Sequence, residues 1–259
     1  MSEIRFDDGA AYEEYMGRWS QLVGEVFLEW LAVPPGLRWL DVGCGNGAFT
    51  AQIVTRCAPA FVTGIDPSEA QLVYARARPG LQQARFERGD AMSLPLDAAS
   101  VDVAVMPLVL FFVPEPARGV QEMARVAAAG GTVAAYSWDM DGGGFPYAVL
   151  RSELEGMGLR APAAPSEDAS RLDVSRRLWE GAGLSAVETR SITVERTFAD
   201  FDTYWSILQQ GPSVGGTLRA LSTAQATTRR ERLRARFPPD TAGRISYRSR
   251  ANAVKGRVL

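Results

Sequence analysis

Short apolar runs alternate with amphipathic stretches along the first half of this chain, and the alternation predicts its secondary structure. Apolar and β-branched residues concentrate in runs of strand length at 38–42, 61–66, 84–88, 101–106 and 132–138. Between them, helical spacing of apolar residues predicts helices over 48–56, 67–78 and 115–128, the last closed by Gly130 and Gly131. Strands that alternate with helices predict an α/β fold with a doubly wound, mostly parallel sheet.

The two ends of the chain predict further helices around this sheet. Residues 10–19 and 21–31 each place apolar and aromatic residues on one helical face, and a Pro-Pro-Gly sequence at 34–36 stops the second helix. After residue 139 the pattern predicts helices over 145–157, 170–182, 201–208 and 218–237. Alternating segments at 187–198 and 244–254 predict two more strands.

The first predicted strand ends in a glycine-rich turn over 43–47, with the sequence GCGNG. Glycine allows positive φ and close approach of a ligand to the backbone, so a strand, a glycine turn and a helix predict a cofactor cradle. Gly43, Gly45 and Ala48 fit a loose G-x-G-x-x-A pattern, which makes a dinucleotide one candidate. Asp41 would repel a pyrophosphate but suits a cationic ligand, and S-adenosylmethionine (SAM) carries a sulfonium and an ammonium group.

Three acids, Asp41, Asp66 and Asp90, end consecutive predicted strands. Ligands of open α/β sheets bind along the carboxyl ends of the strands, so we expect these acids to share one edge. Asp66 follows the glycine turn by about twenty residues, the distance at which a carboxylate can accept hydrogen bonds from both hydroxyls of a ribose. Cys44 lies inside the turn, and we interpret it as a small side chain beside the cofactor and not as a nucleophile.

The composition excludes several kinds of chemistry. The 259-residue chain contains no histidine, so it has no Ser-His-Asp or Cys-His arrangement and no histidine metal ligand. Lys255 is its only lysine, which argues against a Schiff-base mechanism. The two cysteines, Cys44 and Cys57, form no C-x-x-C pair, and we predict no metal site.

Charge and hydropathy narrow the expected partners. The formal net charge of −2 provides no global basic surface for nucleic acid, and no apolar run reaches the length of a membrane span. The N-terminus is polar and acidic, unlike a signal peptide. We therefore expect a cytoplasmic protein that acts on a small molecule, as a monomer or a homodimer, with neither a membrane nor a nucleic acid as partner.

Residues 40–47, with the sequence LDVGCGNG, resemble the first motif of class I SAM-dependent methyltransferases. The resemblance is closest to the group that includes ubiquinone/menaquinone-biosynthesis C-methyltransferases and many small-molecule enzymes, and it fades after about Asp139. It implies a Rossmann-like, seven-stranded sheet with an antiparallel last strand and extra helices. It also implies SAM as methyl donor, S-adenosylhomocysteine as product, and a small-molecule acceptor methylated on oxygen or carbon more readily than on nitrogen.

The same resemblance implies one domain over 1–259, with a helical lid over 1–33, a SAM-binding core over 34–139, and substrate-side helices and the last two strands over 140–259. In this family the acid after the third strand meets the adenine amino group, and the residues after the fourth strand lie beside the methyl-transfer site. The expected cofactor contacts are Asp41, Gly43, Cys44, Gly45, Asp66, Pro67, Ser68, Asp90, Ala91, Met92, Leu108 and Arg18, the last through the cofactor's carboxylate.

Aromatic residues suggest an apolar or planar acceptor, although the same residues could simply pack on the core. The candidate substrate contacts are Tyr12, Tyr15, Met16, Trp19, Phe111 and Trp138. Methyl transfer mainly needs alignment and the exclusion of water, because the sulfonium is already activated. An acceptor that must lose a proton needs a base, and without histidine the weak candidates are Tyr15, Asp139 and Glu14.

Three alternative functions remain open from the sequence. A nicotinamide-dependent oxidoreductase shares the layered sheet but would have to place Asp41 beside a pyrophosphate. A non-catalytic SAM-binding protein would keep the cradle and lack an acceptor site. An RNA methyltransferase would need a basic face, which arginines in 218–237 could supply, although we favour a solvated helix face. The sequence MPLV at 106–109 also lacks the Asn-Pro-Pro-Tyr-like tetrad of base and glutamine N-methyltransferases.

Overall fold

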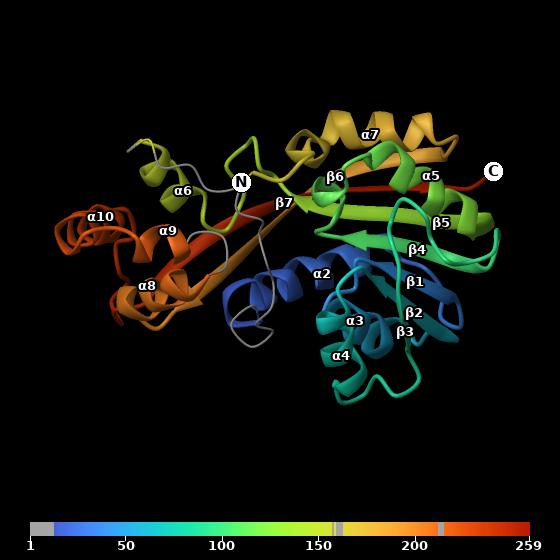
Figure 1. Ribbon diagram of the computed structural model, residues 1–259, viewed down its shortest axis with the longest axis horizontal. Coiled ribbons are helices and arrows are strands. Elements are labelled where there is room, and N and C mark those ends of the chain that lie inside the picture. The colour runs from blue at the N-terminus through green and yellow to red at the C-terminus, as the bar shows by residue number, and fades with distance from the viewer. Residues whose placement is uncertain (1–12, 157, 159–162, 212–214) are drawn as a thin grey trace.

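The computed structural model describes residues 13–156, 158, 163–211 and 215–259, and it confirms the predicted α/β architecture (Figure 1). The strands form one seven-stranded sheet in the order β3-β2-β1-β4-β5-β7-β6. Strands β1 to β5 pair parallel with one another, whereas β7 pairs antiparallel with both β5 and β6. The strands are β1 (Arg38–Val42), β2 (Phe61–Asp66), β3 (Arg85–Arg88), β4 (Val101–Pro107), β5 (Ala127–Trp138), β6 (Ser185–Phe198) and β7 (Ile245–Arg257).

Helices cover both faces of this sheet. The bounds are η1 (Glu13–Gly17), α2 (Arg18–Leu31), α3 (Ala48–Cys57), α4 (Glu69–Ala77), η2 (Leu110–Phe112), α5 (Pro116–Val126), α6 (Ala148–Glu155), η3 (Glu167–Ser170), α7 (Leu172–Gly181), α8 (Phe201–Gln210), α9 (Gly215–Arg219) and α10 (Thr223–Arg236). Apolar residues of α2 and α3 share one core with one face of the sheet, and those of α5 and α7 share a second core with the other. None of the helices in the described ranges combines the length and the apolarity that a membrane span requires.

Parallel register aligns the carboxyl ends of the central strands. Asp41 lies beside Gly64 of β2 on one side and Val105 of β4 on the other. Pro107, the last residue of β4, pairs with Tyr136 near the end of β5. One edge of the sheet therefore holds the ends of β1, β2, β4 and β5, where ligands of such sheets bind.

Strands β6 and β7 extend together beyond the end of β5, the other neighbour of β7. The pairing of β5 with β7 stops at Trp138 and Ala251, whereas β6 and β7 remain paired from Thr193 and Arg250 to Phe198 and Ile245. We call this two-stranded extension, residues 193–198 and 245–250, the ribbon. It carries the helical lobe, which comprises α6, α8, α9 and α10 and lies at the opposite end of Figure 1 from the C-terminus.

Two predicted boundaries are wrong. The N-terminal segment does not break into two helices, because the π-helical η1 continues directly into α2, and Ser20 donates a hydrogen bond back to the carbonyl of Met16. Gly130 and Gly131 do not close a helix either. They lie within β5, where Gly130 N–H donates to Val258 and Gly131 C=O accepts from Val258.

Candidate cofactor site

Asp41, at the carboxyl edge of β1, is fully buried. The Thr50 hydroxyl, in the first turn of α3, donates to its Oδ2 at 2.7 Å, whereas its Oδ1 is buried with no hydrogen-bond partner among the described residues. Burial raises the pKa of Asp41 to about 7, and the nearby Asp66 acts in the same direction against the Thr50 hydrogen bond. A buried carboxylate oxygen without a partner is stabilised when a ligand supplies a hydrogen-bond donor or a positive charge.

The glycine turn is held against β2 and the segment after β4. Gly43, Gly45 and Gly47 all have positive φ, at 72°, 52° and 77°. The N–H groups of Gly43 and Cys44 both donate to the carbonyl of Ile65, at 2.7 and 3.0 Å. A Cβ on Gly43 would lie only 2.4 Å from a methyl carbon of Val109, so a glycine is required here by packing as well as by φ.

Asp66 connects the turn to the start of α4. Its Oδ2 accepts the Gly45 N–H at 2.9 Å, and its Oδ1 accepts the Ser68 N–H at 2.8 Å. Burial raises the pKa of Asp66 despite these two hydrogen bonds. Ser68 caps α4 through the Gln71 N–H, and Pro67 beside it is exposed. Each carboxylate oxygen keeps a further lone pair, so Asp66 can still accept hydrogen bonds from a ligand.

Cys44 has the environment of an inert thiol. It is 6% exposed, and the one hydrogen bond recorded for its Sγ, to the carbonyl of Gly45, is long at 3.9 Å. Burial raises the pKa of Cys44 well above its ordinary value, and the carboxylates of Asp41 and Asp66 raise it further. Because the thiolate is the nucleophilic form, this position is unsuited to nucleophilic catalysis.

The third predicted acid lies on the same edge of the sheet. Gly89 N–H donates to the carbonyl of Asp66 at 3.2 Å, which places the end of β3 beside the end of β2. Asp90 is exposed, and its Oδ1 accepts the Met92 N–H at 2.8 Å, while Ala91 and Met92 are half-buried. The structure therefore aligns Asp41, Asp66 and Asp90 as the sequence predicted.

The turn after β4 forms the next part of the edge. Leu108 has a positive φ of 59° and is fixed by its N–H, which donates to the carbonyl of Tyr136 at 2.7 Å. A left-handed conformation at a non-glycine residue is costly and is often found at functional sites. Phe111, in η2, is 5% exposed, and its carbonyl accepts the Ser166 N–H at 3.1 Å, so η3 fixes η2 in place.

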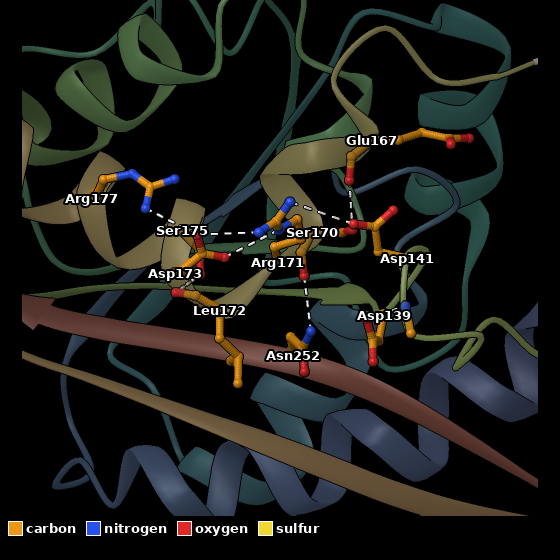
Figure 2. A network of polar contacts seen from close by, with 11 residues as sticks. Asp139, Asp141, Glu167, Ser170, Arg171, Leu172, Asp173, Ser175, Arg177 and Asn252 are labelled. Carbon is orange, nitrogen blue, oxygen red and sulfur yellow. Dashed lines mark hydrogen bonds and ion pairs between the residues drawn. The ribbon is translucent and has the colours of Figure 1, made fainter.

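Asp139, a candidate base, is engaged by neighbouring groups, and Figure 2 shows its position beside the start of α7 and Asn252 of β7. The Arg250 guanidinium donates to its Oδ2 at 2.7 Å through Nε and lies at 2.6 Å through Nη2. The Gly142 N–H donates to its Oδ1 at 3.0 Å. A carboxylate held in this way orders the chain that leaves β5, and both of its oxygens are already engaged by donors of this chain.

The predicted aromatic face of the N-terminal segment packs into the core. Tyr15, Met16 and Trp19 are 1%, 7% and 0% exposed. The ring of Tyr15 stacks on Tyr147 with 4.2 Å between centroids, and Trp19 meets Tyr247 of the ribbon edge-on at 5.9 Å. Core packing, the alternative that the sequence left open, accounts for these contacts.

The remaining predicted residues differ in their surroundings. Trp138 is 2% exposed and belongs to the same core as Trp19. Arg18 is exposed at the start of α2. Tyr12 and the side chain of Glu14 lie outside the described residues, so their predicted roles stay predictions.

Sequence reasoning missed three residues that shape the edge: Thr50, Ser166 and Arg250. Thr50 follows Asp41 closely enough for the strand-turn-helix spacing to have indicated it. Ser166 and Arg250 act across the fold, and no local pattern marks them. No group of three or more His, Cys, Asp or Glu side chains suited to a metal ion occurs within the described ranges.

The middle of the chain is similar to a known family. Residues 40–135 match the family described as "Methyltransferase domain". Phthiotriol/phenolphthiotriol dimycocerosates methyltransferase of Mycobacterium tuberculosis is 28% identical over 159 residues, which cover 61% of this chain and 54% of that protein. 2-Methyl-6-phytyl-1,4-hydroquinone methyltransferase 2 of Oryza sativa is 39% identical over 95 residues, or 37% of this chain and 27% of that protein.

The fold is shared with solved methyltransferases. The structure of Haemonchus contortus phosphoethanolamine N-methyltransferase 2 in complex with S-adenosyl-L-methionine aligns with a TM-score of 0.60 and 16% identity, and covers 99% of this chain and 60% of that chain. At this identity the likeness shows the fold alone. The matched region spans about half the length of the first of the curated relatives, so substrate and activity do not follow from the match itself.

Proposed function

We propose that this protein transfers a methyl group from SAM to a small-molecule acceptor, because residues 40–135 match a methyltransferase-domain family and residues 40–47 resemble the first motif of class I SAM-dependent methyltransferases. Oxygen or carbon is the favoured receiving atom, as the resemblance of the first motif implies. The observation that carries the proposal is the buried edge formed by Asp41, the glycine turn and Asp66. Its unpartnered Asp41 Oδ1 fits a cationic ligand.

The residues along the edge fit the parts of this cofactor. Asp41 lies at the glycine turn, where an ammonium or sulfonium would be stabilised by its charge. Asp66 has acceptor capacity left for ribose hydroxyls, and Asp90 with Ala91 and Met92 lies one strand further along for the adenine. Arg18 is exposed and could pair with a carboxylate through its fork of donors.

SAM, when bound, supplies a methyl group already activated by its sulfonium. The residues of this chain then have two tasks, to align the acceptor for in-line attack and to exclude water. Leu108 and Phe111 are buried apolar residues after the end of β4, and their backbones are fixed by hydrogen bonds with Tyr136 and Ser166. Their rigidity supports the alignment that the reaction needs.

The structure favours an acceptor that needs little help from a base. Asp139 is held by Arg250 and Gly142, and Tyr15 is buried against Tyr147. We therefore propose an enol-type carbon or a hydroxyl of low pKa as the nucleophile. Two relatives have names that include phytyl-hydroquinone and phenolphthiotriol, which supports an acceptor with an apolar part and an oxygen-bearing ring.

The competing functions are less well supported by the site. A pyrophosphate at the glycine turn would meet the buried carboxylate of Asp41, which argues against a nicotinamide dinucleotide. Arginines of α10 contact Glu153 and Asp202 within the helical lobe, which weakens the case for RNA. A non-catalytic SAM-binding protein would share the edge, and only an activity assay separates it from an enzyme.

Calorimetric titration with S-adenosylhomocysteine and with NADH tests the cofactor. We expect micromolar affinity for S-adenosylhomocysteine, no binding of NADH, and a loss of about a hundredfold in Asp66→Ala, since two buried hydrogen bonds and the ribose contact disappear together. Asp97→Ala is the matched control, because Asp97 is exposed in a loop before β4. Preference for NADH, or equal effects of the two variants, would overturn the proposal.

The acceptor is tested by methyl transfer from labelled SAM to hydroquinones, simple phenols, β-dicarbonyl compounds and primary amines. We expect turnover with the acidic oxygen and carbon acceptors and little with the amines. Binding of S-adenosylhomocysteine without turnover of any class would favour a regulatory SAM-binding protein.

A further inference from the structure

The outer edge of β6 is a long strand edge that no other strand covers in the part of the chain that the structure describes. β6 contains 14 residues and is the last strand of the sheet. An uncovered edge presents a row of backbone N–H and C=O groups that can pair with another strand. Proteins usually shorten such edges, interrupt them with proline or bulges, or cover them.

Within the described ranges, contacts close only the beginning of this edge. A register shift lies between Ser185 and Glu188, and the Arg176 guanidinium of α7 donates to the carbonyl of Val187 at 2.9 Å. From Glu188 to Phe198 the pairing with β7 is regular, and the segment contains no proline. The open part of the edge is therefore long, straight and available for pairing.

The charges on this segment are self-complementary about Ile192. Glu188 lies four residues before it and Arg196 four residues after it. Since both are an even number of residues from Ile192, the two side chains point to the same face of the sheet. A two-fold axis through Ile192, perpendicular to the sheet, sets each Glu188 opposite the Arg196 of a second copy.

An axis through Thr189 would also oppose Glu188 to Arg190, but beyond these residues it would have to pair the irregular beginning of β6. An axis through Arg190 opposes two arginines, and an axis through Thr193 opposes Arg190 to Arg196. Like charges directly opposite one another destabilise a strand pair, whereas opposite charges stabilise it. The charges thus favour the register about Ile192 and disfavour those about Arg190 and Thr193.

We propose that this protein forms a two-fold dimer in which the β6 strands of two copies pair antiparallel about Ile192 and join their sheets into one. Two ion pairs, each between Glu188 of one copy and Arg196 of the other, flank the axis. Glu188 already approaches Lys255 at 3.6 Å, but it is 59% exposed, so it can also meet a second partner. The proposal does not depend on the cofactor or on catalysis.

Sedimentation velocity over a range of protein concentrations tests this register. The measurement is made on the wild-type protein, on two single charge-reversal variants and on the double variant. Glu188→Arg and Arg196→Glu each convert two attractive pairs into repulsive ones, and we expect either to raise the dimer dissociation constant about tenfold or more. The double variant Glu188→Arg/Arg196→Glu exchanges the charges and is expected to restore dimerisation. Glu195→Arg is the matched control, because it opposes Thr189 in this register and should leave the dimer unchanged.

A second measurement keeps the test decisive if a variant folds poorly. Amide hydrogen exchange in the wild-type protein should show protection along 189–197 that increases with protein concentration. A monomeric wild-type protein up to about 100 µM, a dimer unaffected by both single reversals, or a double variant that stays monomeric would each overturn the proposal.

Discussion

The cofactor edge and the helical lobe are built in different ways. At the cofactor edge, acids at consecutive strand ends contact backbone and hydroxyl donors close by in the sequence, such as Thr50 for Asp41 and Ser68 for Asp66. In the lobe, arginines contact acids on separate helices, such as Glu153 of α6 with Arg229 of α10 at 3.2 Å. Local motifs therefore form the edge, and contacts between distant segments form the lobe.

The two regions also differ in charge. The four helices of the lobe contain seven arginines and four acids, Glu153, Glu155, Asp202 and Glu231, in a chain whose net charge is −2. Glu153 lies within 4.0 Å of three arginines of α10, and Asp202 contacts two more. The acidic edge suits a cation, whereas the lobe keeps an excess of positive charge after these pairs form.

The largest expected loss of stability comes from a substitution in the glycine turn. In Gly43→Ala the new Cβ would meet Val109, whose branched side chain has little freedom to move, and φ would remain positive. We expect the free energy of unfolding, measured in urea, to fall by about 3 kcal/mol. Gly36→Ala is the control, because Gly36 also has positive φ but nothing within 4 Å, and should cost about 1 kcal/mol. Equal losses would show that packing against Val109 contributes nothing.

The next effect concerns the chain that leaves β5 toward the lobe. Arg250→Met leaves the buried Asp139 with one donor, and we expect a loss of about 2 kcal/mol in the free energy of unfolding. Arg248→Met on the same strand is the control. The ion pair between Arg248 and Glu195 is exposed, and losing it should lower the free energy of unfolding by about 0.5 kcal/mol or less. A small effect for both would mean that Asp139 is free for another role.

The third prediction concerns pH and the cofactor edge. The pKa of Asp41 is raised to about 7, so below that pH the free protein holds the carboxyl protonated. The ammonium group of S-adenosylhomocysteine favours the ionised form, and binding of this ligand must then release a proton. The affinity for S-adenosylhomocysteine should fall about tenfold between pH 8 and pH 6, measured by calorimetry. In Asp41→Asn this dependence should flatten, and an unchanged slope would assign the titration to another group.

The smallest expected effect is the difference in stability loss when either of two acids of the lobe is neutralised. Glu153→Gln removes the carboxylate that three arginines share, and because its side chain is only 16% exposed we expect a loss of about 1 kcal/mol in the free energy of unfolding. Asp202→Asn removes a carboxylate that is 63% exposed and should cost about 0.5 kcal/mol or less. The reverse order would indicate that solvent screening does not govern these pairs.

The sequence predicted the cofactor edge more accurately than the lobe for a physical reason. Strand ends, the glycine turn and the acids are encoded within short segments, so the sequence alone predicts that Asp41, Asp66 and Asp90 lie along one edge. The roles assigned to individual residues stay predictions, because contacts with a ligand are not part of the fold. The boundary at Gly130 was wrong because its partner, Val258, is remote in sequence.

Long-range contacts account for most of what the sequence did not show. Asp139 and Arg250 are 111 residues apart, and Tyr147 donates to the carbonyl of Tyr15 across 132 residues. Helical spacing placed Tyr15, Met16 and Trp19 on one face correctly, but spacing cannot tell an acceptor pocket from a core. Only the packing of that face against Tyr147 and the ribbon distinguishes them.

The position of β7 between β5 and β6 has a consequence for the order of synthesis on the ribosome. β6 emerges before β7, yet it cannot join the sheet until β7 has been made and inserted beside β5. Until Ile245–Arg257 leaves the exit tunnel, the growing chain exposes two unpaired edges, on β5 and on β6. Helices α8, α9 and α10 of the lobe, which lie between β6 and β7 in the sequence, are therefore made before the strand that joins β6 to the sheet.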